Sequence, residues 1–186
     1  MNKFYFSIAF IIFLVHLKAQ ETEYIVFPEN DTLFGEVRLP TSFGKPVYKD
    51  FIFIKKQNDT IEKKLYTYEV QCFVESGKEY LNYDNNILKL LISGKINLYE
   101  CYVTKNYINK IINLLFHEKT IKRNKIRKYK RYYLKKENEN PIIINKKHFK
   151  DTCSEYFSDK FLISDRISRG VYKYKDLPEI VKNYNR

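Results

Sequence analysis

The chain has 186 residues, of which 44% are hydrophobic and 17% aromatic, and it carries 34 Lys and Arg against 22 Asp and Glu, a formal charge of +12. This composition excludes an intrinsically disordered chain, because it supplies enough apolar surface for a core, and the length fits one domain. The charge favours anionic partners, although a sequence rich in Lys, Asn, Ile and Tyr owes part of its basicity to compositional bias.

The first residues have the three parts of a secretory signal peptide. Lys3 supplies a positive start, residues 4–15 form an apolar run, and Ala19 offers a small residue at the cleavage position. A permanent span needs about 20 apolar residues, so a cleaved leader over residues 1–19 is favoured over an uncleaved anchor. Cleavage removes two lysines and no acid, which changes the charge from +12 to +10. We therefore expect residues 20–186 to be one exported domain, in the periplasm or on the outer surface of a bacterial cell, with no stable membrane span.

From Tyr24 to Ile144 the pattern is typical of β-strands, because short runs of β-branched and aromatic residues alternate with Asn, Asp, Gly and Ser. The first predicted strands, which form a meander, are 24–27, 32–39, 51–55, 61–66 and 69–74. The clearest hairpin joins 87–92 to 96–103 through Ser93 and Gly94, where glycine can take the positive φ of a tight turn. Two more strands are predicted at 129–136 and 142–144.

Helical patterns come late in the chain. Residues 106–118 space their apolar side chains as a helix does, or they form a long apolar loop. Three C-terminal helices are predicted. The first is 146–157, capped by Asn145, and the second is capped by Asp159 or Ser164, runs through Arg169 and is closed by Gly170. The third is preceded by Asp176, has Pro178 in its first turn and runs to about Tyr184. The predicted fold class is α+β, with an antiparallel β-sheet or partly closed barrel followed by C-terminal helices, about residues 145–186, that pack on it.

The strongest charge feature is a basic segment, residues 119–136, which has ten positive side chains and no acid. Its charge equals the net charge left after leader removal, so the rest of the chain is close to neutral. Such a segment attracts lipopolysaccharide phosphates, anionic lipid headgroups or nucleic acid, and its tyrosines offer stacking surfaces. The alternative is a solvated loop that binds nothing. The candidate binding residues are Lys119, Lys122, Arg123, Lys125, Arg127, Lys128, Lys130, Arg131, Tyr132 and Tyr133.

No catalytic constellation stands out. Only His117 and His148 remain after cleavage, and they lie in different elements. The sequence therefore argues against a zinc site or a histidine-based triad. Strand carboxylates such as Glu36 and Glu62 could serve a hydrolase, but on alternating strands they more often form the wet face of a sheet. We therefore predict no catalytic residue, no metal and no cofactor. The expected function is a non-enzymatic envelope protein that acts through protein interaction, on an aromatic sheet face or the terminal helices, with anionic polymer binding as the alternative.

The cysteines are odd in number, so an exported chain can form at most one internal disulfide. Cys72, Cys101 and Cys153 each lie among hydrophobic residues, which favours buried thiols. A disulfide between Cys72 and Cys101 is the alternative.

The chain contains Asp-Thr-Leu-Phe-Gly-Glu at 31–36, Leu-Leu-Ile-Ser-Gly-Lys-Ile-Asn-Leu-Tyr at 90–99, Tyr-Tyr-Leu-Lys-Lys at 132–136, and a closing helical pattern over 148–185. In these segments it resembles a group of small, exported, functionally uncharacterised proteins of Bacteroidota. The resemblance implies an envelope or extracellular setting and transfers no functional residue. The long basic insertion before Tyr132 departs from the group.

The same resemblance implies a modification. In such bacteria, periplasmic O-glycosylation recognises Asp, then Ser or Thr, then an aliphatic residue. Thr32 and Thr60 stand in triplets of this kind, 31–33 and 59–61. The alternative is that both are unmodified turn residues.

Overall fold

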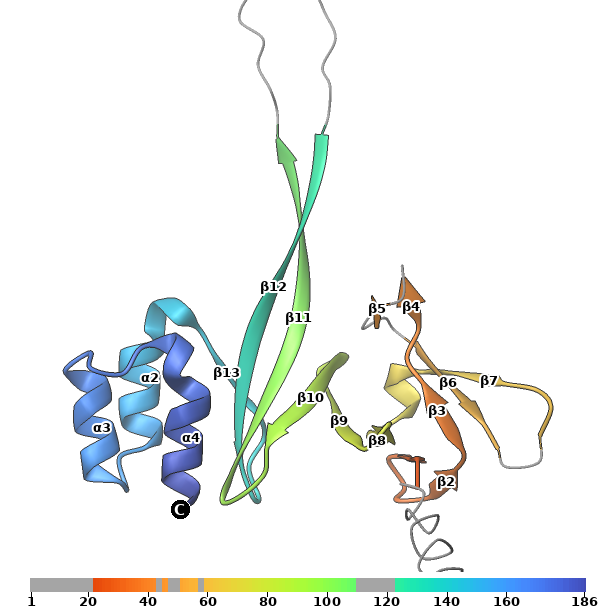
Figure 1. Ribbon diagram of the computed structural model, residues 1–186, viewed down its shortest axis with the longest axis horizontal. Helices are drawn as coiled ribbons and strands as arrows, with labels where there is room; N and C mark the ends of the chain where they lie inside the picture. Colours follow the sequence, from red (N-terminus) through yellow and green to blue (C-terminus); the bar gives the residue numbers. More distant parts are fainter. Residues whose placement is uncertain (1–21, 43–44, 47–50, 57–58, 110–122) are drawn as a thin grey trace, which may run out of the picture. The chain divides into compact units, whose positions relative to one another are not determined.

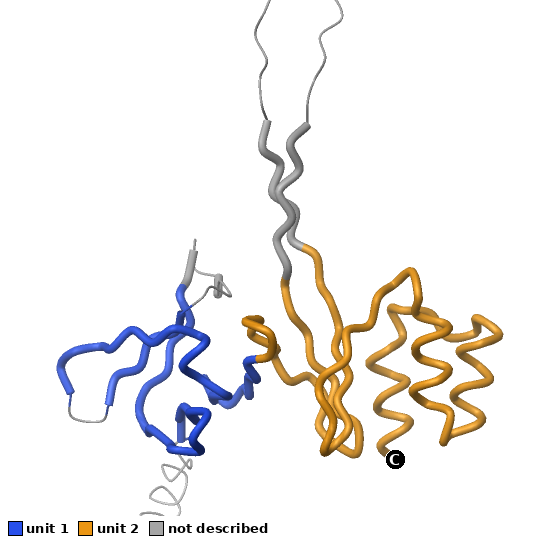
Figure 2. Tube along the Cα trace, turned by 180° about the vertical axis from the view of Figure 1, so that it is seen from behind, with its two compact units in different colours: residues 1–82 blue, residues 83–186 orange. Residues whose placement is uncertain are grey.

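The computed structural model describes residues 22–42, 45–46, 51–56, 59–109 and 123–186. Its contacts divide the chain into two compact units, residues 1–82 (unit 1) and 83–186 (unit 2) (Figure 2). The fold class is α+β, as the sequence predicts: the sheets are antiparallel and open, and the C-terminal helices pack on the sheet of unit 2 (Figure 1). The predicted leader lies outside the described residues, and the single domain over 20–186 stays a prediction.

Unit 1 contains two small antiparallel sheets. One has the order β9-β8-β1-β2, and its strands are β1 (Tyr24–Val26), β2 (Thr32–Phe34), β8 (Cys72–Glu75) and β9 (Lys78–Tyr83). The other has the order β3-β6-β7, and its strands are β3 (Glu36–Arg38), β6 (Phe51–Lys55) and β7 (Lys63–Tyr66). The pair β4 (Thr41–Ser42) and β5 (Lys45–Pro46) and the 3-10 turn η1 (Thr67–Glu69) complete the described part. The buried hydrophobic residues of unit 1 are Ile25, Val37, Leu39, Ile52, Ile54, Leu65, Val70, Phe73 and Tyr80.

Gly35 divides the strand that the sequence predicts at 32–39. A Cβ at this position would lie 2.5 Å from the carbonyl oxygen of Lys55, so a side chain does not fit there. On one side of the glycine, Phe34 pairs with Tyr24, and on the other, Glu36 pairs with Lys55. The predicted strand therefore becomes β2 and β3, which belong to different sheets.

The carboxylate of Glu23 connects the two sheets of unit 1. It accepts a hydrogen bond from the backbone N–H of Val37 on β3 at 2.6 Å. Its other oxygen accepts one from the N–H of Ser76, in the turn between β8 and β9, at 2.7 Å. Hydrogen bonds to a charged acceptor are stronger than neutral ones, so Glu23 holds both segments together.

Strand β9 is absent from the sequence prediction. It follows β8 through Ser76 and Gly77, whose φ angles are 50° and 68°, and it leads to the next strand through Asp84 and Asn85, at 50° and 55°. Two-residue hairpin turns with positive φ at both positions favour Gly, Asn and Asp. The turn signals were therefore present, but the intervening strand has little hydrophobic alternation.

The sheet of unit 2 has the order β13-β12-β11-β10. Its strands are β10 (Asn86–Ile92), β11 (Ile96–Asn109), β12 (Arg123–Lys136) and β13 (Ile142–Ile144), which confirms the predicted hairpin and the predicted strand at 142–144. The prediction of a helix at 106–118 is wrong over 106–109, where β11 pairs with β12, and the remainder lies outside the described residues. Cross-strand pairing overrides the helix-like spacing there.

The C-terminal elements of unit 2 are η2 (Lys146–His148), α2 (Phe149–Tyr156), α3 (Phe161–Ser168), η3 (Tyr174–Asp176) and α4 (Leu177–Asn185). Asn145 caps η2 as predicted, since its side chain accepts a hydrogen bond from the N–H of Lys147 at 3.1 Å. Gly170 follows α3 with a φ of 74°, also as predicted.

The predicted caps of α3 are wrong. Lys160 occupies the cap position without a side-chain hydrogen bond, one residue after Asp159. Ser164 lies inside the helix, where its hydroxyl donates to the carbonyl oxygen of Ser154 at 2.7 Å. Its hydroxyl therefore links α3 to α2 instead of starting the helix.

The helices cover one face of the unit 2 sheet and form the larger core. The buried residues of this core are Ile96, Leu98, Leu134, Ile144, Phe149, Cys153, Phe157, Ile167, Leu177, Ile180, Val181 and Tyr184. At the end of α4, the amide of Asn185 accepts from the N–H of Ile96 at 3.0 Å and donates to its carbonyl oxygen at 2.9 Å. The C-terminal helix is thus attached to the start of β11.

Candidate functional site

The basic segment lies largely on β12. Lys119 and Lys122 fall outside the described residues. Four other candidates occupy backbone positions in the first half of the strand: Arg123, Lys125, Arg127 and Lys128. The structure describes side chains from Tyr129 onward, and successive residues of the strand point to opposite faces of the sheet.

On the face that the helices cover, Lys130 forms an ion pair with a buried acid. Its ammonium nitrogen lies 2.7 Å from Oε2 of Glu100, whose side chain is 8% exposed. The hydrogen bond to Glu100 raises the pKa of Lys130 above its usual value, although burial acts in the opposite direction. The same ammonium lies 5.8 Å and 5.7 Å from the ring centroids of Tyr102 and Tyr132. Lys130 is therefore largely neutralised within the fold.

On the opposite face, Arg131 is close to aromatic groups and to a thiol. It donates a hydrogen bond to the hydroxyl of Tyr129 at 2.9 Å, and its guanidinium carbon lies 5.2 Å from that ring centroid. In the strand register it pairs with Cys101 of β11. Burial raises the pKa values of Cys101 and of Tyr133, while the positive charge of Arg131 lowers both. Both groups stay protonated at neutral pH, so Arg131 keeps its charge without a compensating anion from either.

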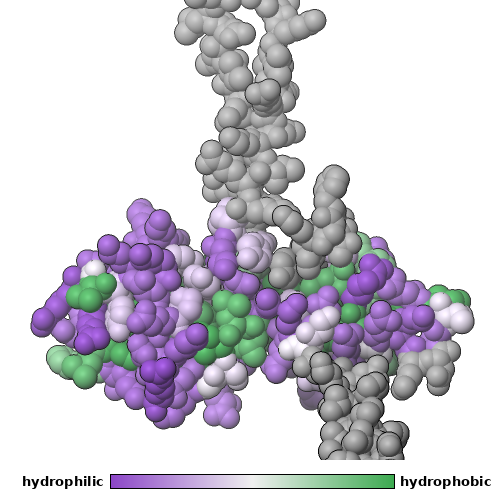
Figure 3. All heavy atoms as spheres, viewed as in Figure 1, coloured by the Kyte–Doolittle hydropathy of each residue, from purple (hydrophilic) through white to green (hydrophobic). Residues whose placement is uncertain are grey.

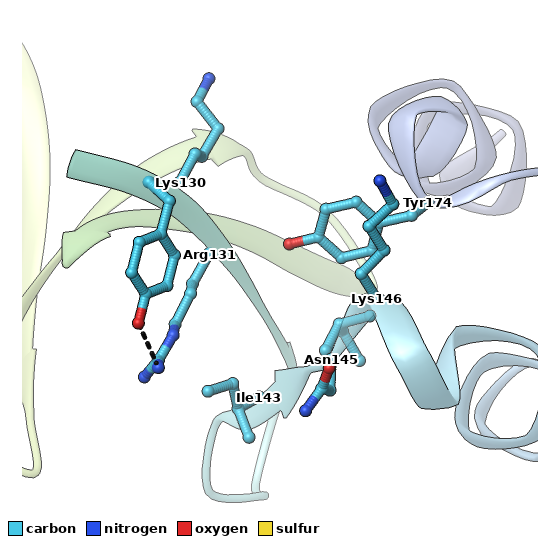
Figure 4. A pocket seen from close by; sticks show the side chains of 8 residues that line it. Lys130, Arg131, Ile143, Asn145, Lys146 and Tyr174 are labelled. Carbon is cyan, nitrogen blue, oxygen red and sulfur yellow. Dashed lines mark hydrogen bonds between the residues drawn. The ribbon is translucent and has the colours of Figure 1, made fainter. Parts of the chain in front are cut away.

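A cleft of about 360 Å³ opens beside β12, where β13 ends. The residues that line it are Tyr129, Lys130, Arg131, Ile143, Ile144, Asn145, Lys146 and Tyr174. In Figure 4, Tyr174 points its hydroxyl toward β12, which carries Tyr129 and Arg131, and the ammonium of Lys130 points away from Ile143 and Asn145. Burial raises the pKa of Tyr174, so its hydroxyl remains a hydrogen-bond donor. None of these lining residues is acidic, which makes the cleft a cationic site with aromatic walls.

The structure shows where the other predicted sites lie, but it does not test the predicted modification or disulfide. Thr32 and Thr60 are both exposed, which O-glycosylation requires, but the modification stays a prediction. None of the three cysteines is bonded to another in the structure. Cys101 and Cys153 are buried, as the favoured interpretation predicts, and Cys72 is half-buried. Because Cys72 and Cys101 belong to different units, a disulfide between them also stays a prediction.

Of the two carboxylates named as hydrolase candidates, Glu62 has a structural partner. Glu62 makes two hydrogen bonds with Arg38, at 3.0 Å and 2.7 Å, which raises the pKa of the arginine. His148 is exposed, and His117 lies outside the described residues. Within the described part of the chain, no group of three His, Cys, Asp or Glu side chains could hold a metal ion.

Of the eight residues that line the cleft, the sequence predicted two as binding residues. It selected Lys130 and Arg131 from the charge run, but it missed Asn145, Lys146 and Tyr174 as partners in one site. A cap residue, a lysine before a helix and a tyrosine in a turn carry no common motif, and only the packing of η2 and η3 against the sheet brings them together. The buried Glu100 had a signal, since it is the only charged residue in the strand predicted at 96–103.

Comparison with known proteins yields no match among protein-family models, curated proteins or solved structures. Among the residues that the structure describes, none of the helices has both the length and the apolar character needed to cross a membrane.

Proposed function

We propose that the protein is an exported, non-enzymatic binding protein of the cell envelope, and that it recognises an anionic partner through the cleft beside β12. The observation that carries the proposal is the cleft itself, in which Lys130, Arg131 and Lys146 lie with two tyrosines and no acid. Ligand sites commonly combine apolar walls with a few convergent polar groups. The leader-like residues 1–19 support export.

The net attraction of the cleft comes from two of its three cations. Glu100 already compensates Lys130 at 2.7 Å. Arg131 hydrogen-bonds to the neutral hydroxyls of Tyr129 and Tyr133, and Lys146 lies in the first turn after β13. An anion in the cleft would therefore interact mainly with Arg131 and Lys146, and it would be flanked by Tyr129 and Tyr174.

The terminal helices offer a weaker case as a binding surface. Phe161 and Leu162 at the start of α3 are 75% and 74% exposed, and Val171 after it is 63% exposed. Figure 3 shows the helical side of unit 2 as mainly hydrophilic, with its apolar atoms in separate groups. Single exposed hydrophobic residues are normal on protein surfaces, so they do not by themselves indicate a partner.

Binding to heparin over a range of salt concentrations tests the proposal. Replacing Arg131 and Lys146 together by glutamine should weaken binding and reduce the slope of log K against log salt by about two, because each lost contact releases about one counterion fewer. The matched control replaces Lys150 and Lys182, two exposed lysines on α2 and α4, by glutamine. Equal losses in the two double variants, or binding that ignores salt, would contradict the proposal.

A further inference from the structure

The cleft follows the edge of a strand. Tyr129 and Arg131 lie on one face of the sheet and Lys130 on the other, yet all three line the same cavity. A cavity lined from both faces must run along the edge between them. Strand β13 covers this edge only from Tyr132 to Leu134, whereas β12 begins at Arg123. Within the described residues of unit 2, no strand pairs with the edge of β12 from Arg123 to Arg131.

The cap at Asn145 explains why β13 stops. Its side-chain oxygen accepts from the N–H of Lys147, and its carbonyl oxygen accepts from the N–H of His148, both at 3.1 Å. These bonds turn the chain into η2 directly after Ile144, so β13 does not continue along β12, and no other described strand of unit 2 takes its place. In an antiparallel sheet, alternate residues direct both backbone groups toward each neighbouring strand. Every second residue from Arg123 to Arg131 therefore presents an N–H and a C=O at the open edge.

The charge of β12 selects the kind of strand that can add there. From Arg123 to Lys136 the strand contains eight Lys and Arg and no acid. Like charges that face each other across two strands are destabilising, and cationic edges discourage edge-to-edge association of identical chains. A second copy of β12 would therefore be repelled. An added strand with Asp or Glu side chains would instead be attracted, and its acids would meet Arg131 on one face and Lys146 beside the other.

We propose that this edge binds an extended acidic segment of a partner protein, which adds to the sheet as a strand along β12 beyond the end of β13. Hydrogen bonds along the edge supply affinity that does not depend on sequence, and the cationic cleft selects acidic side chains. This inference rests on the proposed anion-binding function and names the ligand class. It separates a polypeptide from a polysaccharide or a lipid headgroup, which offer charge without a strand's hydrogen-bonding groups.

A synthetic ten-residue peptide of alternating Glu and Val is the first probe, and fluorescence anisotropy with the purified protein is the measurement. The second probe is the same peptide with ester links in place of its central amide bonds, which keeps the charge and removes the backbone donors. We expect the ester peptide to bind at least about tenfold more weakly, since several backbone hydrogen bonds are lost together. Binding of the amide peptide should also slow hydrogen exchange at Arg123 to Arg131.

Charge variants of the protein provide the complementary measurement. Arg131→Glu should abolish binding of the amide peptide, whereas Lys182→Glu, an equal charge change on an exposed position of α4, should leave it unchanged. If the two peptides bind equally while heparin binding persists, strand addition is overturned and the anion-binding function stands. If neither peptide nor heparin binds, both proposals fall. A protein that dimerises through β12 without peptide also overturns the inference, because a second copy is then the occupant.

Discussion

The two units differ in whether helices cover a face of their sheets. In unit 2, helices cover one face, and aromatic rings such as Phe157 and Tyr184 pack inside with their centroids 5.4 Å apart. In unit 1, the described residues form no α-helix, and one face of β3-β6-β7 carries rings that are only half-buried. There the ammonium of Lys64 lies 4.1 Å from the ring centroid of Phe51, and the guanidinium carbon of Arg38 lies 4.6 Å from that of Phe53.

The difference shows two ways to protect aromatic rings from water. A ring that is packed under helices is fully buried, so it makes its full hydrophobic contribution to the free energy of folding. This arrangement requires a long amphipathic C-terminal sequence. A lysine or arginine covers a ring with its aliphatic stem and keeps its charge in solvent, which adds a modest cation–π attraction. Removing a ring from the core under the helices should therefore cost more than removing one from the uncovered face of unit 1.

Matched truncations give the largest expected effect. Phe157→Ala, at a position that is 0% exposed, should lower the free energy of unfolding of unit 2 by about 3–5 kcal/mol. Phe53→Ala, on the uncovered face of unit 1, should cost about 1 kcal/mol, because its ring is only half-buried. Urea unfolding followed by hydrogen exchange reports the loss separately for each unit. Similar costs at the two positions would break the comparison.

Glu23 tests whether unit 1 depends on polar links where unit 2 depends on packing. Glu23→Ala leaves the N–H groups of Val37 and Ser76 without their charged acceptor, so we expect unit 1 to lose about 2–3 kcal/mol. Hydrogen exchange in β3 and β8 should accelerate together. The control is Glu29→Ala, in the exposed turn between β1 and β2, which should change stability by less than about 0.5 kcal/mol. A loss confined to one of the two strands would show that Glu23 does not connect the sheets.

The sequence predicted the elements with local signals and missed those that depend on distant contacts. The strands at 51–55 and 142–144 were predicted with their exact bounds, because β-branched and aromatic runs end at polar turns. Gly35 alone does not predict that the chain changes sheets there. The cause is the carbonyl oxygen of Lys55, twenty residues later on β6. Residues 106–109 looked helical because periodicity alone does not include the cross-strand partner.

The cleft has the same division between local and distant information. The run of charge in the basic segment identified Lys130 and Arg131, but not which of them stays electrostatically active. That distinction depends on Glu100, which lies thirty residues earlier and meets Lys130 only through the register of β11 with β12. Tyr174 lines the site from η3, which comes after α2 and α3 in the chain. Composition could thus suggest an anionic ligand, while the site itself required the fold.

Lys130→Met makes the smallest change and shows how unit 2 tolerates a buried acid. It leaves Glu100 uncompensated, but Lys130 is 41% exposed, so we expect a loss of about 1–2 kcal/mol, below the 3–5 kcal/mol of a fully buried pair. A double-mutant cycle with Glu100→Gln isolates the pair.

Because folding raises the pKa of Lys130 above 10.5, the contribution of the ion pair to stability is fully present below that pH and disappears as the pH rises through the raised value. The difference between wild type and variant should therefore stay constant from pH 7 to 9 and shrink above about pH 10.5; a difference that already shrinks near neutral pH would mean that another group holds Glu100.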